Sequence, residues 1–346
     1  MINPELTWEK STTKNLGFDF TFLQNRLTFC ADIFERKVTD ILIPGGKDYP
    51  ALIGDDNLPF ENAGVLKTTG FELQAKWSDK LSNGFAYSVG VALSDDKAEV
   101  LSYPSNPTNK IGDGVLYKGY TVGDIWGYET GGILQESDFD GVGPNGKPLY
   151  HGAYFKGGQP YPGYVWYQDL DHDGVITSGL STVDDPGDKK VIGNNAPRYR
   201  YNITANFQYK GFDLDLMFQG VGKRDYWLKD VSSYWGGGAG SWETYNQSWT
   251  PERTDAKFPM YGSGIGSYAQ SGYLLDASYI KLKQVILGYT FPKALIGKVG
   301  LEKLRLNIAA YNLFTLSDVP KYYDSDYLSD AYPPKRTFSV GIQVGF

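Results

Sequence analysis

One acidic loop carries residues whose types and spacing could hold a metal ion. Counting from Asp169, carboxylates occupy positions 1, 3 and 5, which are Asp169, Asp171 and Asp173, and a glycine follows at position 6. Ca²⁺ prefers clustered oxygen ligands, the glycine permits a sharp turn, and the main-chain carbonyl of Val175 would serve at position 7. Position 12 is Leu180, where a helix-flanked calcium loop has glutamate. The pattern therefore predicts either a Ca²⁺ loop with a structural role or a solvated acidic turn.

Aromatic side chains in the long polar segments of the chain are a second group that could bind a ligand. Their flat rings can stack on sugar faces or grip peptides while their polar edges stay in water. Packing of these segments on themselves is the alternative role for each ring. The candidates for contact with a substrate are Trp126, Trp166, Trp235, Trp242 and Tyr322.

Groups that usually carry catalysis are sparse. The chain has 2 histidines and 1 cysteine, and neither an HExxH nor a GxSxG arrangement occurs in it. Asp138 and Asp140 could be imagined as the two carboxylates of a glycosidase, but nothing in the sequence fixes their separation. We therefore expect no enzymatic activity, and the formal net charge of −7 argues against a nucleic-acid partner.

The elements that position these residues are β-strands. The 27 tyrosines, 18 phenylalanines and 42 glycines favour pleated strands joined by flexible turns. The end of the chain alternates without a break, with Phe338, Val340 and Ile342 on one face and small or polar residues on the other. A change of apolar face near Lys283 and Gln284 predicts a β-bulge. The nine expected strands lie within residues 16–22, 27–33, 71–77, 85–93, 198–210, 212–218, 279–291, 304–310 and 337–346.

Short and long connections alternate strictly between these segments. Outer-membrane barrels have short periplasmic turns and long extracellular loops, and a spanning strand needs only about 9–11 residues. The sequence therefore predicts an antiparallel transmembrane β-barrel segment. Because nine is an odd number and bacterial single-chain barrels have even counts, we expect this wall to be part of a larger barrel. The alternative is a secreted, Ca²⁺-dependent glycan-binding β-sandwich that uses the Asp169 loop and exposed aromatic rings.

Short motifs along nearly the whole chain resemble the C-terminal part of SusC/RagA transporters, which are TonB-dependent outer-membrane proteins. Each motif is weak alone, but their order and spacing together are specific. The matching stretches include Asn3-Pro4-Glu5-Leu6-Thr7-Trp8, Glu61-Asn62-Ala63-Gly64, Tyr209-Lys210-Gly211-Phe212, Trp249-Thr250-Pro251-Glu252 and Tyr332-Pro333-Pro334.

This resemblance implies uptake of oligosaccharides or peptides across the outer membrane of a Gram-negative cell. It further implies a barrel of about 22 strands with a luminal plug, and a SusD-like surface lipoprotein as partner and lid. Residues 1–346 would then be the C-terminal part of the barrel domain, with the plug and the N-terminal strands absent from this chain. TonB would act through that missing N-terminal part.

The resemblance also assigns roles to particular residues. A comparable loop in the family is closed by a later acid before a basic residue and Ile-Gly, which here is Asp188, with Asp184 and Asp185 in reserve. The terminal Phe346 matches the aromatic residue that the barrel-assembly machinery reads. The aromatic loop residues would contact the substrate or the lipoprotein lid.

Overall fold

A single antiparallel sheet dominates the structure, which is a computed structural model describing residues 5–45, 59–227, 245–263, 268–319, 323–328 and 334–346. Its strands follow the order β1-β2-β3-β4-β13-β14-β17-β18-β19, so each strand pairs with the members of this sheet that come before and after it in the sequence. The strands are β1 (Lys10–Phe22), β2 (Leu27–Pro44), β3 (Phe60–Lys80), β4 (Ala86–Ser102), β13 (Arg198–Tyr209), β14 (Phe212–Lys223), β17 (Tyr279–Thr290), β18 (Lys303–Ser317) and β19 (Thr337–Gly345).

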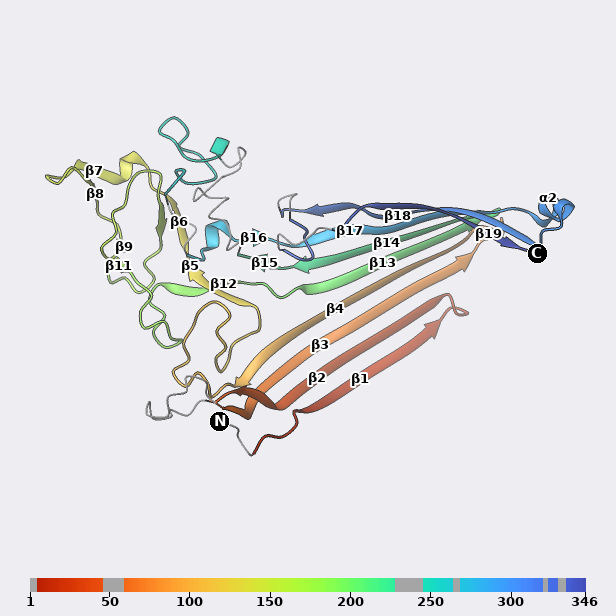
Figure 1. The fold of residues 1–346 in the computed structure, drawn as a ribbon, viewed down its shortest axis with the longest axis horizontal. Helices are drawn as coiled ribbons and strands as arrows, with labels where there is room; N and C mark the ends of the chain where they lie inside the picture. Colours follow the sequence, from red (N-terminus) through yellow and green to blue (C-terminus); the bar gives the residue numbers. More distant parts are fainter. Residues whose placement is uncertain (1–4, 46–58, 228–244, 264–267, 320–322, 329–333) are drawn as a thin grey trace.

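The sheet is bent, and its connections divide cleanly between its two ends. Figure 1 shows β1 to β4 as one arm and β17 to β19 as the other, with the short turns at one end and the long segments at the opposite end. The predicted alternation of short and long connections is therefore confirmed. The all-β antiparallel barrel wall expected from the sequence is the fold observed.

The strand register puts the apolar rows on one face of the sheet. Leu16 pairs with Ile33 and Phe20 pairs with Phe29, so their side chains share a face. On the last strand Val340 is 76% exposed. A core face would bury such residues against a second layer, whereas a lipid-facing wall leaves them on the outside. The exposed apolar rows contradict the β-sandwich interpretation.

The predicted change of face in the seventh strand is confirmed. Against β18, the register shifts between Leu282 and Gln284. The neighbouring strand β14 shows the matching shift between Met217 and Phe218. In the pairing with β14, Lys283 is the extra residue of a β-bulge, which returns the apolar side chains on both sides of it to the same face; in the pairing with β18, the extra residue is on β18.

Glycines on the polar face make room for charged side chains. A Cβ atom at Gly288 would collide with the Arg305 guanidinium and the Asp213 carboxylate, and one at Gly341 would collide with Asn307. Glycine in a strand often marks such a close approach. The polar face therefore accommodates ion pairs within the sheet surface.

Several elements extend beyond the sequence prediction. β2, β3 and β4 contain 18, 21 and 17 residues, more than a spanning strand requires. One of the connections at the short end contains two helical turns, α2 (Lys293–Ile296) and η5 (Gly297–Val299), in addition to the expected strands. Within the described part of the chain, no helix has the length and apolar character needed to cross a membrane.

The described parts of the two longest connections contain short strands and 3-10 turns, which form a cap at one end of the sheet (Figure 1). The strands within the cap contain only 2 to 6 residues each, which is too short for a periodic signal in the sequence. The cap elements are β5 (Asp124–Tyr128), β6 (Thr130–Ile133), η2 (Glu136–Asp138), β7 (Phe139–Val142), β8 (Pro148–Tyr150), β9 (Tyr154–Phe155), β10 (Val165–Tyr167), β11 (Val175–Ile176), β12 (Lys189–Asn194), β15 (Asp225–Tyr226), η4 (Ser271–Tyr273) and β16 (Leu275–Asp276).

A matched pair of substitutions tests which face meets lipid. Val340 and Ser339 are adjacent on β19 and point to opposite faces. Arginine on the lipid side near the bilayer midplane costs about 2–4 kcal/mol, whereas luminal substitutions are tolerated. Val340→Arg should therefore sharply reduce the folded, heat-modifiable protein in outer membranes, and Ser339→Arg should leave it near the wild-type level. Equal losses, or the reverse order, would contradict the assignment.

Candidate functional site

The acidic loop predicted from the sequence forms a tight turn in the cap. The Gly174 N–H donates to Asp169 Oδ2 at 2.8 Å, and the Asp173 N–H donates to Asp171 Oδ1 at 3.1 Å. His172 and Gly174 both have positive φ, at 61° and 85°, which is the left-handed conformation that glycine adopts without strain. These contacts fold the carboxylates of Asp169 and Asp171 toward one another.

Asp188 closes this turn from a distance. It has no exposed surface, and its two carboxylate oxygens accept hydrogen bonds from the N–H groups of Leu170 at 2.8 Å and Thr177 at 2.7 Å. A buried carboxylate held by two backbone donors is fixed in position. Asp188 thereby connects the start of the acidic turn, its end, and β12, which begins at the next residue.

The oxygen atoms of this turn suit a hard cation. Asp169, Asp171 and Asp188 each offer a carboxylate oxygen, and these oxygens lie within 4.8 Å of one another. Oδ1 of Asp169 is buried and has no hydrogen-bond partner. A buried oxygen without a donor is costly, and a bound cation would satisfy it. The donor set therefore fits Ca²⁺ chemically.

The other predicted ligands take different positions. Asp173 lies outside the group of three, and its Oδ1 accepts the N–H of Val175 at 2.8 Å. Val175 opens β11 and pairs with Tyr154. The reserve residues Asp184 and Asp185 are exposed and also lie outside the group.

The negative charges in the turn influence one another. Burial opposes ionisation of Asp169, but backbone N–H groups, led by that of Gly174, donate to it, and the net effect lowers the pKa of its carboxyl. For Asp171, the N–H of Asp173 lowers the pKa, but burial and the neighbouring carboxylates outweigh it and raise the pKa overall. The turn thus concentrates negative charge that a cation would relieve.

Two predicted aromatic contacts are used within the cap. The indole N–H of Trp126 donates to the Tyr117 hydroxyl at 2.9 Å, and the two rings meet edge to face. The ring of Trp166 lies against Gly131, where a Cβ atom would collide with it. Both side chains are half-buried, so the packing role weighed for them is realised. Trp235, Trp242 and Tyr322 lie outside the described residues.

A buried glutamine joins the two long connections of the cap, and sequence reasoning did not identify it. Gln270 has no exposed surface; its Nε2 donates to the Tyr167 hydroxyl at 3.3 Å, and its Oε1 accepts from Thr130 Oγ1 at 3.2 Å. The adjacent Ala269 carbonyl accepts the Tyr128 N–H at 2.9 Å. The described parts of segments 103–197 and 224–278 therefore pack against each other.

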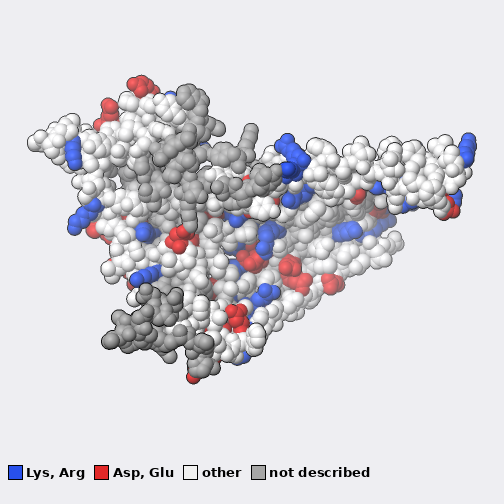
Figure 2. Space-filling model, in the orientation of Figure 1, with Lys and Arg blue, Asp and Glu red and all other residues white. Residues whose placement is uncertain are grey.

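The polar face of the sheet carries ordered charges. Arg305 Nε donates to Asp213 Oδ1 at 3.2 Å, and Asn206 Nδ2 donates to Asp215 Oδ1 at 2.6 Å. Figure 2 shows acidic and basic side chains on the concave side of the sheet, between its two arms. A wall with an apolar outer face and a charged inner face separates lipid from a water-filled interior.

A buried lysine ties the last long connection to this polar wall. Lys281 is 4% exposed, and its Nζ contacts Asp324 at 2.8 Å and Asp326 at 2.7 Å. Burial alone would raise the pKa of Asp326, but the hydrogen bonds from Lys281 and Tyr279 lower it. These partners lie more than 40 residues apart, so no local sequence signal could have revealed them.

The predicted assembly residue stands at the end of the sheet. Phe346 follows β19 and is 89% exposed. Its side chain continues the apolar row of Phe338, Val340, Ile342 and Val344 along the same strand. Reading of this residue by the assembly machinery stays a prediction.

The fold and the two-faced wall define a transmembrane β-barrel protein, and comparison with known proteins identifies its family. Residues 2–313 match the family model described as "TonB dependent receptor-like, beta-barrel". Since this match covers most of the chain, the chain belongs to that family. The resemblance to SusC/RagA transporters is confirmed, and the protein is placed in the outer membrane.

Named relatives and solved structures agree with this assignment. The chain is 27% identical to "TonB-dependent receptor P3" of Formosa agariphila, covering 99% of this chain and 35% of that protein. It is 26% identical to "TonB-dependent receptor SusC" of Bacteroides thetaiotaomicron, covering 100% of this chain and 33% of the relative. A chain in "Structure of the RagAB peptide transporter" has the same fold, with a TM-score of 0.71 at 20% identity, covering 99% and 36% of the two chains. The chain thus spans about a third of the length of these relatives.

Proposed function

We propose that this chain is the C-terminal part of the barrel of an outer-membrane transporter that takes up oligosaccharides or peptides in a TonB-dependent manner. The observation that carries the proposal is the sheet itself, with one exposed apolar face, one charged face, and all long connections gathered in a cap at one end. The chain aligns with about a third of each relative, which supports the proposal that it is one part of a longer polypeptide.

The remaining parts of such a transporter follow from its physical task. A wall of nine strands leaves the edges of β1 and β19 without partners within the described residues, and open edges are not tolerated in hydrocarbon. We propose that further strands close the ring, that a plug fills the lumen, and that TonB acts through the N-terminal part. A SusD-like surface lipoprotein would meet the cap, and the barrel-assembly machinery would insert the protein.

Uptake measurements test this proposal. In cells of the source organism, fluorescently labelled oligosaccharides and peptides too large for porins should enter when the gene is present. Entry of at least one of these probes should fall to background after deletion of the gene, after loss of TonB, and after collapse of the proton gradient by an uncoupler. Uptake that persists under all three conditions would contradict the proposed function. Complementation with the intact gene is the control.

We further propose that the acidic turn binds Ca²⁺ and that the ion stiffens the cap. Support comes from the three clustered carboxylates, the buried Asp169 oxygen without a donor, and the fixed Asp188. Asp169, Asp171 and Asp188 would hold the ion, with the carbonyl of Val175 as a further candidate. The ion would neutralise the turn and join it to β12, a structural role rather than a catalytic one.

A pair of conservative variants tests the calcium proposal. Asp171→Asn removes one ligand charge from an exposed position and should weaken Ca²⁺ binding at least about tenfold, as ligand charge sets affinity in such loops. Asp184→Asn, also exposed and outside the group, should bind like the wild type. Calorimetric titration of the purified protein with Ca²⁺ measures both. Absence of a Ca²⁺ signal in the wild type, or equal losses in the two variants, would rule the site out.

A further inference from the structure

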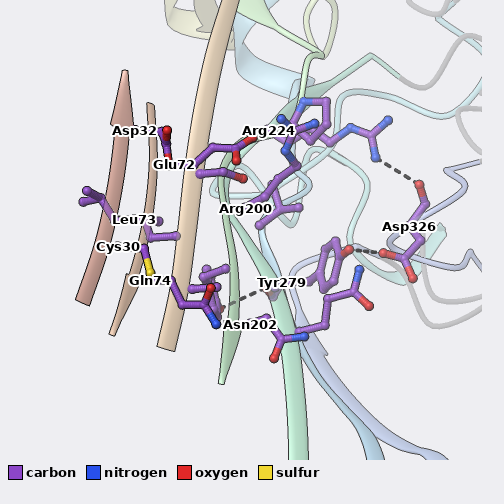
Figure 3. A pocket seen from close by; sticks show the side chains of 18 residues that line it. Cys30, Asp32, Glu72, Leu73, Gln74, Arg200, Asn202, Arg224, Tyr279 and Asp326 are labelled. Carbon is purple, nitrogen blue, oxygen red and sulfur yellow. Dashed lines mark hydrogen bonds between the residues drawn. The ribbon is translucent and has the colours of Figure 1, made fainter. Parts of the chain in front are cut away.

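A hollow of about 610 Å³ lies on the polar face of the sheet, beside the cap. Asp32, Glu72 and Gln74 line one side of it, on β2 and β3, and Arg224, Tyr279 and Asp326 line the other (Figure 3). Its volume falls in the range of small-ligand sites. Carboxylates without a cation lie on the first side, while on the second side the carboxylate of Asp326 is paired with Lys281 and a cation, Arg224, has no carboxylate partner among the described residues.

Arg224 supplies that cation. Its Nε donates to the Asn195 carbonyl at 2.9 Å, and its Nη1 donates to the Asp326 carbonyl at 3.0 Å. Within the described residues it forms no ion pair with a carboxylate. Two main-chain oxygens therefore fix the direction of the guanidinium without neutralising it. Arginine in this state presents a forked donor to a carboxylate or another flat anion.

The opposite side offers negative charge. Asp32 and Glu72 are paired in the register of β2 and β3, so both side chains leave the sheet at the same level. Asp32 accepts a hydrogen bond from Asn15 Nδ2 at 3.0 Å. Neither carboxylate forms an ion pair in the part of the chain that the structure describes. Two adjacent carboxylates without a cation favour an ammonium group on the ligand.

Amide side chains line the wall between the two charged sides. Gln74, Asn202 and Gln219 lie at one level, because Gln74 and Asn202 both pair with Ala92 and Asn202 pairs with Gln219. None of the three has a hydrogen-bond partner among the described residues. Each amide offers both donors and acceptors, which matches the N–H and C=O groups of a peptide backbone.

The hollow lacks a free aromatic platform for a sugar among its described lining residues. Tyr201 lies against Gly220, where a Cβ atom would collide with the ring, and its hydroxyl donates to the Tyr279 carbonyl at 3.2 Å. Tyr279 itself is buried, and its hydroxyl donates to Asp326. Neutral sugars present apolar faces that stack on exposed rings. The lining therefore favours a peptide over a neutral oligosaccharide.

The spacing of the charges limits the length of that peptide. Glu72 on β3 and the end of β14, next to Arg224, are three strand steps apart in the sheet order. At about 4.8 Å per step this is roughly 14 Å along the wall. An extended chain rises about 3.3 Å per residue, so about four residues cover the same span.

We propose that this hollow binds a short zwitterionic peptide, with the peptide carboxylate at Arg224 and its ammonium group at Asp32 and Glu72. This proposal rests on the proposed transport function and names the substrate class for it. The amides of Gln74, Asn202 and Gln219 would bind the peptide backbone between the two charged ends. Arg200 also lines the hollow but is already paired with Asp96, so it contributes less to recognition.

Tetra-alanine is the probe, used with free ends, with only the amine acetylated, with only the carboxylate amidated, and with both ends blocked. Calorimetric titration is performed on the intact transporter purified from its own cells, with maltotetraose as the neutral sugar. The free peptide should bind at least about tenfold more tightly than the doubly blocked one, because hydrogen bonds to charged groups are the strong ones. Equal binding of these two peptides, no peptide binding, or tighter binding of maltotetraose would overturn the proposal.

Variants of the hollow test which residues bind each end of the peptide. Arg224→Gln should abolish the preference for a free carboxylate and keep the preference for a free amine, and the double variant Asp32→Asn with Glu72→Gln should do the reverse. Arg224→Lys should retain part of the carboxylate preference. Lys76→Gln, which removes a cation of β3 outside the hollow, should change neither. A uniform weakening of all four peptides in each variant would show a merely structural role and contradict the assignment.

The binding measurement separates this proposal from the transport function on which it rests. Gradient-dependent uptake of other probes with no end-group preference in the hollow would overturn only the peptide site. Loss of gradient-dependent uptake altogether would overturn the transport function, while the titrations would still report whether the hollow selects charged ends. Heat modifiability of each variant on gels establishes that the barrel is folded before its binding is compared.

Discussion

The structure depends on one constraint, which is that hydrocarbon offers no hydrogen-bond partners to a polypeptide backbone. An antiparallel sheet satisfies its N–H and C=O groups between neighbouring strands, and only its side chains then decide what each face can meet. In this chain the pairing of Leu16 with Ile33 and of Ile308 with Val340 places apolar rows on one face over the whole width of the sheet. The opposite face is free to carry charge.

The charged face and the cap follow from that division. On the luminal side, Gly288 leaves room for the ion pair of Arg305 with Asp213. Outside the lipid, the long connections can pack as segments of a water-soluble protein do. Buried polar groups such as Asp188, Gln270 and Lys281 then fix long connections that the sheet alone would leave unsupported, because each has several well-placed partners.

The strands could be predicted from the sequence because their signal is local. Alternation in residues 337–346, and the change of face at Lys283, reflect a two-residue period that each strand carries by itself. The extensions of β2, β3 and β4 toward the cap lack this contrast, since outside the lipid neither face must be apolar. Their full length was therefore missed.

The site could be predicted only in part, for the same physical reason. The spacing of Asp169 and Asp171 is local, and the structure brings their carboxylates together with that of Asp188. The contacts of Lys281 with Asp324, and of Gln270 with Tyr167, join residues far apart in the sequence. The sequence did not single out Arg224 as a binding residue, because its proposed role depends on its partners in the fold. Its guanidinium donates to two main-chain carbonyls and pairs with no carboxylate among the described residues.

The central claim is that successive side chains of one strand meet lipid and water in turn. Labelling of single cysteines along β13 tests it most directly, after Cys30, the single cysteine of these 346 residues, is replaced by serine. The account predicts that cysteines at Thr204 and Asn206 react with a water-soluble thiol reagent in intact outer membranes, whereas those at Ile203 and Ala205 react only with a lipid-soluble one. Uniform reactivity along the strand, or the opposite alternation, would contradict it.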